Sequence, residues 1–369
     1  MFFSFRELTA GPSVVRRAAW LAASLIGLAT TPALATDKIT LPIVGGLAGI
    51  TQYTALEEPF WRDELPRLSN GRIAATISPF DRSGIRAQDM LALMRIGVVP
   101  YGTVLLTVAS GDEPLLAGVD LPAVNPSFDM LRKTAALYRP QIEKVLEERY
   151  GIELLGLYTY PAQVVFCTKP FSSLSDLAGR KVRTSSVAQS ELMSGIGAVP
   201  IITPFAEIMP SLQRGVVDCA ITGSLSGFDI GLHRSTSHLH TLAINWGLTV
   251  FGANKAAIAA LPDDVRSLIR TSVSALERRI WDAGERDTEV GFACNSGSAD
   301  CTRQPTGKMK LVAPGPDDEA LRRRLLADVV LPAWIDRCGI DCAIAWNDAV
   351  GPALGLLVDA DGTARRAAH

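Results

Sequence analysis

The order of apolar segments constrains the fold most, because a strand–helix–strand–helix–strand pattern occurs twice, about 140 residues apart. The first copy comprises the ranges 38–44, 51–68, 72–78, 87–96 and 98–108. The second copy comprises the ranges 181–183, 186–193, 199–202, 204–215 and 216–221. Alternating strands and helices favour parallel sheets joined by right-handed crossovers. We therefore expect two α/β domains of similar build, with Pro210 bending the helix that contains it.

Two further extended segments are expected to connect these domains. One spans 151–157, after a helix over 128–150, and the other spans 242–251. Residues at the ends of such strands can absorb a closing rotation, and open parallel sheets bind ligands beyond the carboxyl ends of their strands. The sequence thus predicts a ligand cleft between two domains with hinge strands. The expected boundaries are 36–160 plus 247–286 for domain I and 161–246 plus 287–369 for domain II.

The first 35 residues have the pattern of a secretory signal peptide. Arg16 and Arg17 precede an apolar run over 18–30, and residues 33–35 read Ala-Leu-Ala, a small-residue cleavage pattern. The apolar run is short for a membrane span, and no stop-transfer pattern follows. A retained N-terminal anchor is the alternative. We expect a soluble, exported chain that resides in the periplasm.

Six cysteines fit an oxidising compartment, where up to three disulfides could form. If pairing is local, the candidate pairs are Cys294 with Cys301, Cys338 with Cys342, and Cys167 with Cys219. Cys167 and Cys219 lie in short apolar runs that could be neighbouring strands. A zinc site using His233, His238 and His240 is the alternative, but no paired CxxC or HExxH spacing accompanies these histidines. We expect no metal and no cofactor.

Charge and motif content exclude other classes of function. The chain carries 36 Lys and Arg against 38 Asp and Glu, so it offers no basic field to bind nucleic acid. It contains no GxSxG elbow, Walker A run, GxGxxG fingerprint or zinc-protease helix. In the segment 223–227, Leu225 occupies the position that a serine nucleophile would need. These observations favour a binding protein over an enzyme.

A single arginine is the strongest ligand-binding candidate. Arg183 is expected at the carboxyl end of a strand, shortly before a helix whose first amides are unpaired donors at the positive end of a dipole. A guanidinium group can bind a carboxylate or phosphate bidentately. Thr222, at the end of the third strand of the same unit, could add a hydroxyl group. The alternative is a surface arginine paired with Asp176 or Glu191.

Several segments around Arg183 carry a family signature. They are 171–183, 197–200, 204–207 and 212–218, with less specific pieces at 69–73, 84, 94–99 and 261–265. Together they resemble the substrate-binding proteins of tripartite ATP-independent periplasmic (TRAP) transporters, the DctP-like family, over about residues 39–285. The resemblance implies a periplasmic-binding-protein fold that captures an organic acid and delivers it to the membrane permease. It places the carboxylate-binding arginine of the family on Arg183.

The chain also departs from this family in several places. Gln163 stands where many members carry a second arginine, and Thr222 stands where an asparagine often closes the signature. Cys219 replaces a usual glycine, and the Cys-rich end beyond residue 292 lies outside the common pattern. The resemblance is therefore to a divergent, Cys-containing branch whose ligand the sequence does not name.

The remaining pocket candidates are aromatic or charged residues at strand ends. Tyr160, Trp246 and Phe228 could form apolar walls, although aromatic residues at such positions are often core. Arg82 could face the cleft from the first unit, or lie in a solvated turn.

We therefore expect a periplasmic solute-binding protein, monomeric and without catalytic residues, that binds a small organic acid and hands it to TRAP permease subunits. A ligand sensor of the same fold, or an exported hydrolase or lyase that uses paired carboxylates, are the alternatives.

Overall fold

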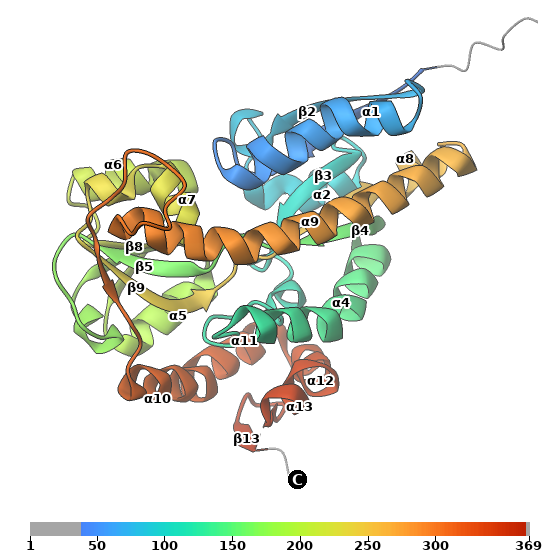
Figure 1. Cartoon of the computed structure of the whole chain (residues 1–369). Coiled ribbons are helices and arrows are strands. Elements are labelled where there is room, and N and C mark those ends of the chain that lie inside the picture. Colours follow the sequence, from blue (N-terminus) through green and yellow to red (C-terminus); the bar gives the residue numbers. More distant parts are fainter. Residues whose placement is uncertain (1–37, 367–369) are drawn as a thin grey trace, which may run out of the picture. The chain divides into compact units, whose positions relative to one another are not determined.

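The computed structural model describes residues 38–366. The predicted signal peptide lies outside the described residues. The described chain forms two mixed sheets with helices packed on them (Figure 1). Their strand orders are β2-β1-β3-β10-β4 and β11-β9-β5-β8-β6-β7, and a short pair β12-β13 follows near the C-terminus. The α/β class expected from the sequence is confirmed.

The five-stranded sheet is built mainly from the first half of the chain. Its strands are β1 (Ile39–Gly45), β2 (Ile73–Pro79), β3 (Tyr101–Leu105), β4 (Ile152–Tyr158) and β10 (Thr249–Asn254). The helical segments between them are η1 (Gln52–Glu57), η2 (Phe60–Glu64), α1 (Leu65–Leu68), η3 (Phe80–Arg82), η4 (Ala87–Asp89), α2 (Met90–Arg95), α3 (Leu106–Ala109), η5 (Pro114–Ala117), α4 (Phe128–Tyr150) and α8 (Lys255–Ala259). The predicted helix over 128–150 is confirmed. The side chain of Ser127 caps its start and Gly151 ends it in the left-handed conformation, with φ of 62°.

The six-stranded sheet contains the second copy of the repeated pattern. Its strands are β5 (Gln163–Cys167), β6 (Lys181–Thr184), β7 (Val199–Ile202), β8 (Cys219–Gly223), β9 (His238–Asn245) and β11 (Lys310–Val312). Its helical segments are η6 (Leu174–Leu177), α5 (Val187–Ile196), η7 (Phe205–Glu207), α6 (Ile208–Gln213), α7 (Ser224–Asp229) and η8 (Leu232–Arg234). The side chain of Ser186 caps α5 by accepting a hydrogen bond from the Gln189 amide at 3.2 Å.

The expectation of purely parallel sheets is wrong. Strands within each repeated unit do run parallel, as in β1 with β2 and β6 with β8. However, β10 runs antiparallel to β3 and β4, and β5 runs antiparallel to β8 and β9. The reason is that β5 and β10 carry the chain from one sheet into the other, so they enter against the local strand direction. The alternation of helices and strands does not reveal such connecting strands.

Three local predictions also need correction. The apolar run 98–108 is not one strand, because β3 ends at Leu105 and α3 follows; a short apolar run does not distinguish a buried strand from a buried helix. The extended run 242–251 is interrupted at residues 246–248 between β9 and β10. The helix predicted over 204–215 is divided into η7 and α6, with Pro210 as the third residue of α6, where its missing N–H has no helical partner to lose.

A single long helix, α9 (Asp263–Ser296), packs against elements of both sheets (Figure 1). Its first half buries Val265, Ile269, Val273, Leu276 and Ile280 in the same apolar cluster as β1, β2 and β10 residues. Near its end, Gly291 lies so close to Ser224 and Leu225 of α7 that an added Cβ would fall 2.4 Å from the Leu225 nitrogen. Only glycine permits this approach. Helix α9 extends through Cys294.

The C-terminal segment contains α10 (Pro316–Leu325), η9 (Leu326–Val330), α11 (Leu331–Cys338), α12 (Ile340–Asp348), α13 (Val350–Leu354), β12 (Leu356–Val358) and β13 (Ala364–Arg366). Trp334 is fully buried and donates its indole N–H to the Pro114 carbonyl at 2.8 Å, which attaches α11 to η5. Residues 38–366 belong to one compact unit, so the predicted boundaries between domains I and II stay a prediction.

All three predicted disulfides are present. Cys167 and Cys219 are direct register partners on β5 and β8, so their bridge spans neighbouring strands. The other two bridges close short segments, Cys294 with Cys301 and Cys338 with Cys342. Within residues 38–366, no helix combines the length and the apolar character needed to cross a bilayer.

Candidate ligand-binding site

Arg183 is buried in the six-stranded sheet. It is the third residue of β6, in register with Ile201 of β7 and Ala220 of β8. Although it is charged, only 4% of it is exposed to solvent. The alternative of a surface arginine is wrong, because Glu191 pairs with Arg337 instead.

The guanidinium group of Arg183 has only carbonyl partners. Its Nε and Nη2 donate to the Thr203 carbonyl at 2.9 and 2.7 Å, and its Nη1 donates to the Ile221 carbonyl at 2.8 Å. Arginine has five N–H donors, so two remain without an acceptor among residues 38–366. No carboxylate in this part of the chain forms an ion pair with it. Burial lowers the pKa of Arg183 to about 9, so the group remains protonated at neutral pH.

Two other predicted residues lie in the same sheet as Arg183: Thr222 on the adjacent strand β8, and Gln163 on β5, on the far side of β8. Thr222 immediately follows Ile221, whose carbonyl Arg183 binds, and Thr222 is itself buried. Gln163 begins β5 opposite Gly223 and donates its Nε2 to the Pro161 carbonyl at 3.0 Å. The pairing of β5, β8 and β6 therefore brings Arg183, Thr222 and Gln163 to one region of the sheet.

An apolar cluster is linked to Arg183 through Phe205, which follows Thr203, a hydrogen-bond partner of Arg183, by two residues. Tyr160 packs with Leu47, Ile50 and Phe80, and Phe205 packs against this cluster. Thr203 accepts hydrogen bonds from the Arg183 guanidinium group, and Phe205 follows it by two residues. This short segment therefore links Arg183 to the apolar cluster around Tyr160. The hydroxyl oxygen of Tyr160 also accepts a hydrogen bond from the Leu47 amide at 3.4 Å. Sequence reasoning did not single out Phe205, which appeared only within the family signature at 204–207.

The remaining three predicted residues are placed elsewhere. Trp246 is buried, donates its indole N–H to the Asn125 carbonyl at 2.9 Å and packs on Phe128. Arg82 is exposed in the short turn η3. Phe228 stacks on His233 with ring centroids 4.5 Å apart. No hydrogen bond within residues 38–366 joins these three side chains to Arg183, and their binding role stays a prediction.

A buried carboxylate that the sequence did not reveal organises the crossing between β9 and β10. Asp120 accepts hydrogen bonds at 2.7 to 2.9 Å from the backbone N–H groups of Trp246, Gly247 and Leu248. We call these three N–H groups the hinge amides. The Asn245 side chain donates to it as well, at 3.2 Å. Burial is the main influence on the Asp120 pKa and raises it to about 6, while the four hydrogen bonds oppose this shift. The carboxylate is therefore ionised at neutral pH and fixes the crossing segment.

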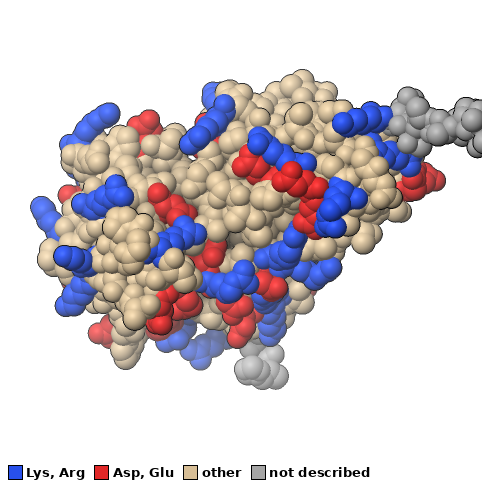
Figure 2. Space-filling view, turned by 45° about the horizontal axis from the view of Figure 1, so that its top comes forward, with Lys and Arg blue, Asp and Glu red and all other residues tan. Residues whose placement is uncertain are grey.

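The histidines do not converge on a metal position. His240 lies 3.4 Å from the Asp318 carboxylate, whereas His233 stacks on Phe228. No group of three or more His, Cys, Asp or Glu side chains between residues 38 and 366 is arranged to hold a metal ion. On the face shown in Figure 2, acidic and basic side chains are interspersed, in keeping with the near-neutral charge of the chain.

Comparison with solved structures identifies the class of fold. The chain is similar to DctP7 of Bordetella pertussis, an extracytoplasmic solute receptor that binds pyroglutamic acid. The TM-score is 0.73 at 20% sequence identity, and the match covers 84% of this chain and 98% of that one. The fold is therefore that of an extracytoplasmic solute receptor.

Sequence comparison gives the family. Residues 48–290 match the model of the bacterial extracellular solute-binding proteins, family 7, also called DctP. Because this match spans more than half of the chain, the chain belongs to that family, as the signature around Arg183 predicted.

Two curated relatives agree with this assignment. A solute-binding protein of Albidiferax ferrireducens is 25% identical over 230 residues, which cover 61% of this chain and 67% of the relative. The ectoine-binding periplasmic protein TeaA of Halomonas elongata is 25% identical over 163 residues, which cover 44% of this chain and 46% of the relative. The match thus spans about two thirds of the first relative and less than half of the second.

Proposed function

We propose that this protein binds a small organic acid through Arg183 and delivers it to a TRAP-type membrane permease. The observation that supports this most strongly is the buried guanidinium group with no carboxylate partner. A buried charge without a counter-ion costs several kcal/mol, and the chain retains it on β6. An anionic ligand would supply the negative counter-charge and accept hydrogen bonds from the two remaining N–H groups of Arg183.

The surroundings of Arg183 favour a particular kind of acid. Carboxylates match the fork of a guanidinium group, and Thr222 and Gln163 could add one neutral hydrogen bond each. A single cationic anchor favours a monocarboxylate over a dicarboxylate. The cluster of Leu47, Phe80, Tyr160 and Phe205 could contact an apolar or cyclic body. The two relatives named for pyroglutamic acid and ectoine bind small acids of this kind, and pyroglutamate is the first compound to test.

The location of the protein follows from its cysteines and its first residues. Three disulfides are stable in an oxidising compartment, and the 1–35 segment has the pattern of a secretory signal peptide. We therefore infer that the protein works in the periplasm. We also propose that it is a monomer that binds its ligand without changing it chemically. Its partner is the permease of a TRAP transporter.

The first experiment is a thermal-shift screen of small monocarboxylates, each with its methyl ester as an uncharged control. A ligand present at 100 times its dissociation constant stabilises the folded state by about 2.7 kcal/mol. We expect at least one acid to raise the melting temperature while its ester does not. Recovery of the acid unaltered, checked by mass spectrometry, would exclude a hydrolase or lyase acting on it.

The second experiment tests the residue. Arg183→Ala should weaken binding of the identified acid by at least about 100-fold, because the buried counter-charge is lost. Arg180→Ala is the matched control, since Arg180 also donates to carbonyl oxygens, those of Lys169, Pro170 and Asp176, but on the exposed surface. Equal affinities of the two variants, measured by calorimetry, would remove Arg183 from the site.

A further inference from the structure

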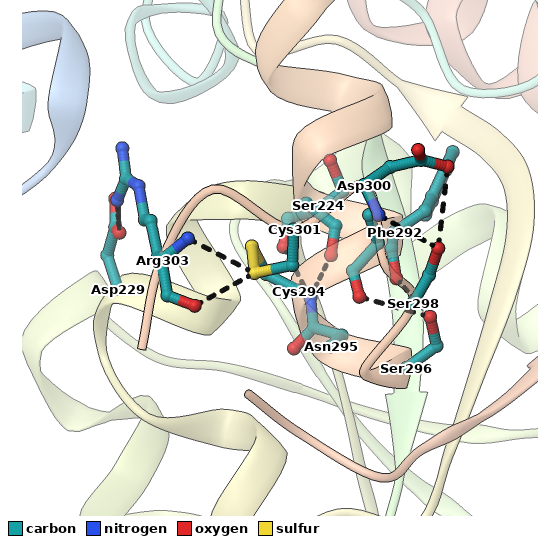
Figure 3. The surroundings of a disulfide bond; sticks show 12 residues. Ser224, Asp229, Phe292, Cys294, Asn295, Ser296, Ser298, Asp300, Cys301 and Arg303 are labelled. Carbon is teal, nitrogen blue, oxygen red and sulfur yellow. Dashed lines mark hydrogen bonds and ion pairs between the residues drawn. A yellow bond between two sulfur atoms is a disulfide. The ribbon is translucent and has the colours of Figure 1, made fainter. Parts of the chain in front are cut away.

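A loop closed by a disulfide at the end of α9 connects parts of the chain that belong to different sheets. Cys294 lies in the last turns of α9 and is bonded to Cys301, two residues before Arg303 (Figure 3). This loop lies beyond residues 48–290, the part that the family model matches. The contacts of Arg303 are therefore a property of this chain that the family assignment does not explain.

Arg303 reaches both sides of the boundary between the sheets. Its Nη1 forms an ion pair with the carboxylate of Asp229, the last residue of α7 on the six-stranded side. Its Nη2 donates to the Thr51 hydroxyl at 2.6 Å, and this hydroxyl donates to Asp229 at 3.3 Å. Thr51 directly precedes η1 on the five-stranded side. The three side chains, which we call the latch, thus close a hydrogen-bonded triangle across the boundary.

Apart from the contact to Thr51, the contacts of the segment around this disulfide within residues 38–366 are to the six-stranded side. Cys294 is fully buried beside Leu225 and Phe228 of α7. The Asn295 side chain donates to the Ser224 carbonyl at 2.8 Å, and the Gly307 amide donates to the Cys294 carbonyl at 2.7 Å. If the two sides separate, Arg303 therefore stays with Asp229, and the contacts that break are those to Thr51.

The latch shares a crevice with Tyr160, one of the predicted ligand-binding residues. A narrow crevice is lined by Thr51 and Gln52 from one side, by Ser226 and Asp229 from the other, and by Tyr160. Tyr160 is also part of the apolar cluster near Arg183. Asp229 is mostly buried, with 9% of its side chain exposed, whereas 33% of the Arg303 side chain is exposed. Two of the three latch residues, Thr51 and Asp229, therefore line the crevice, and the third, Arg303, is partly exposed to solvent.

We propose that Arg303 is a positioning residue that holds the two sides closed and slows the release of ligand. The disulfide keeps the guanidinium group in place on one side, so that only the Thr51 hydroxyl must arrive from the other. This proposal rests on the proposed function for the ligand, but closure itself can be measured without any ligand. A charge-assisted hydrogen bond contributes enough to change an opening equilibrium by about 10-fold.

The test compares Thr51→Val and Arg303→Met with the unchanged mature chain. Thr51→Val removes the hydroxyl but keeps the ion pair and the disulfide, so it stays informative if Arg303→Met disturbs the loop. Arg86→Met is the matched control, since Arg86 pairs with Asp89 on the surface and crosses no boundary. Hydrogen–deuterium exchange of the free protein over residues 46–52 and 224–230 should be about 10-fold faster in both latch variants and unchanged in the control.

Ligand release and coupling complete the test. Dissociation of pyroglutamate, followed by stopped flow, should be about 10-fold faster in each latch variant. Thr51→Val should have a smaller effect in the Arg303→Met background than it has alone, because both changes remove the Arg303–Thr51 hydrogen bond and only the one from Thr51 to Asp229 is left to lose. Exchange at the control rate in both latch variants would overturn the latch. Faster exchange in a protein that binds no acid would support the latch and count against the proposed function alone.

Discussion

A buried glutamate makes the stability of this protein depend on pH in a way that one substitution should remove. Glu57 is fully buried, and its two carboxyl oxygens accept hydrogen bonds from the Gly46 amide and the Gln52 side chain, both at 2.8 Å. No cation forms an ion pair with it among the described residues. Burial raises the pKa of Glu57 from 4.5 to about 7, against the effect of these hydrogen bonds.

The sign of the effect follows from this raised pKa. The folded protein holds the Glu57 proton at pH values where the unfolded chain has lost it. The resulting stabilisation is complete below the unfolded pKa, near 4.5, and is lost as the pH rises through about 7. A shift of one pKa unit corresponds to about 1.4 kcal/mol, so the difference of 2.5 units amounts to about 3 kcal/mol.

The assay is urea unfolding of the mature protein and of Glu57→Gln between pH 4.5 and pH 8. The free energy of unfolding of the wild type, relative to the variant, should fall by about 3 kcal/mol across this range. Other groups with raised pKa values, such as Asp287, are common to both proteins and cancel in the difference. Glu58→Gln, which removes the partner of Arg62, is the control and should leave the pH dependence unchanged. If Glu57→Gln shows the same pH dependence as the wild type, the burial argument is refuted.

Three further predictions concern stability. Asp120→Asn should lower the free energy of unfolding by about 3 kcal/mol, because at least one hinge amide then faces an N–H group instead of an oxygen; a change below 1 kcal/mol would contradict this. Replacing both Cys167 and Cys219 by serine should cost about 4 kcal/mol in urea unfolding, since the bridge closes a loop of 52 residues, and equal midpoints would exclude that contribution. Gly291→Ala should lower stability by about 2 kcal/mol, because its Cβ would overlap the backbone of Leu225, and a neutral result in thermal unfolding would show that α9 and α7 can separate.

The repeated order of elements, several helix ends and the three cysteine pairs could be predicted because each depends on local chemistry. Ser186 and Gly197 mark the ends of α5 through a side-chain cap and a left-handed backbone. The strand containing Arg183 was likewise predicted from its place in the repeated order of strands and helices. Antiparallel β5 and β10 could not be predicted, because strand direction depends on which sheet the chain enters, and the sequence pattern of the strand itself does not encode this.

The predicted site residues fall into two groups, those placed by the strand pattern and those chosen only by residue type. Arg183 and Thr222 lie on the adjacent strands β6 and β8, and Gln163 lies on β5 beyond β8, so their place in one sheet follows from strand pairing. Trp246 and Phe228 were selected only as aromatic residues near strand ends, and the structure buries both among other rings. Their binding role stays a prediction that rests on residue type alone, because aromatic side chains also prefer the core.

The most direct test of the account is a crystal structure of the protein with the acid found in the screen. We expect a carboxylate oxygen of the ligand within about 3 Å of an Nη atom of Arg183, with the contacts to the Thr203 and Ile221 carbonyls retained. A bound acid whose carboxylate is held elsewhere, with the Arg183 guanidinium still contacting only carbonyl oxygens, would contradict the central claim.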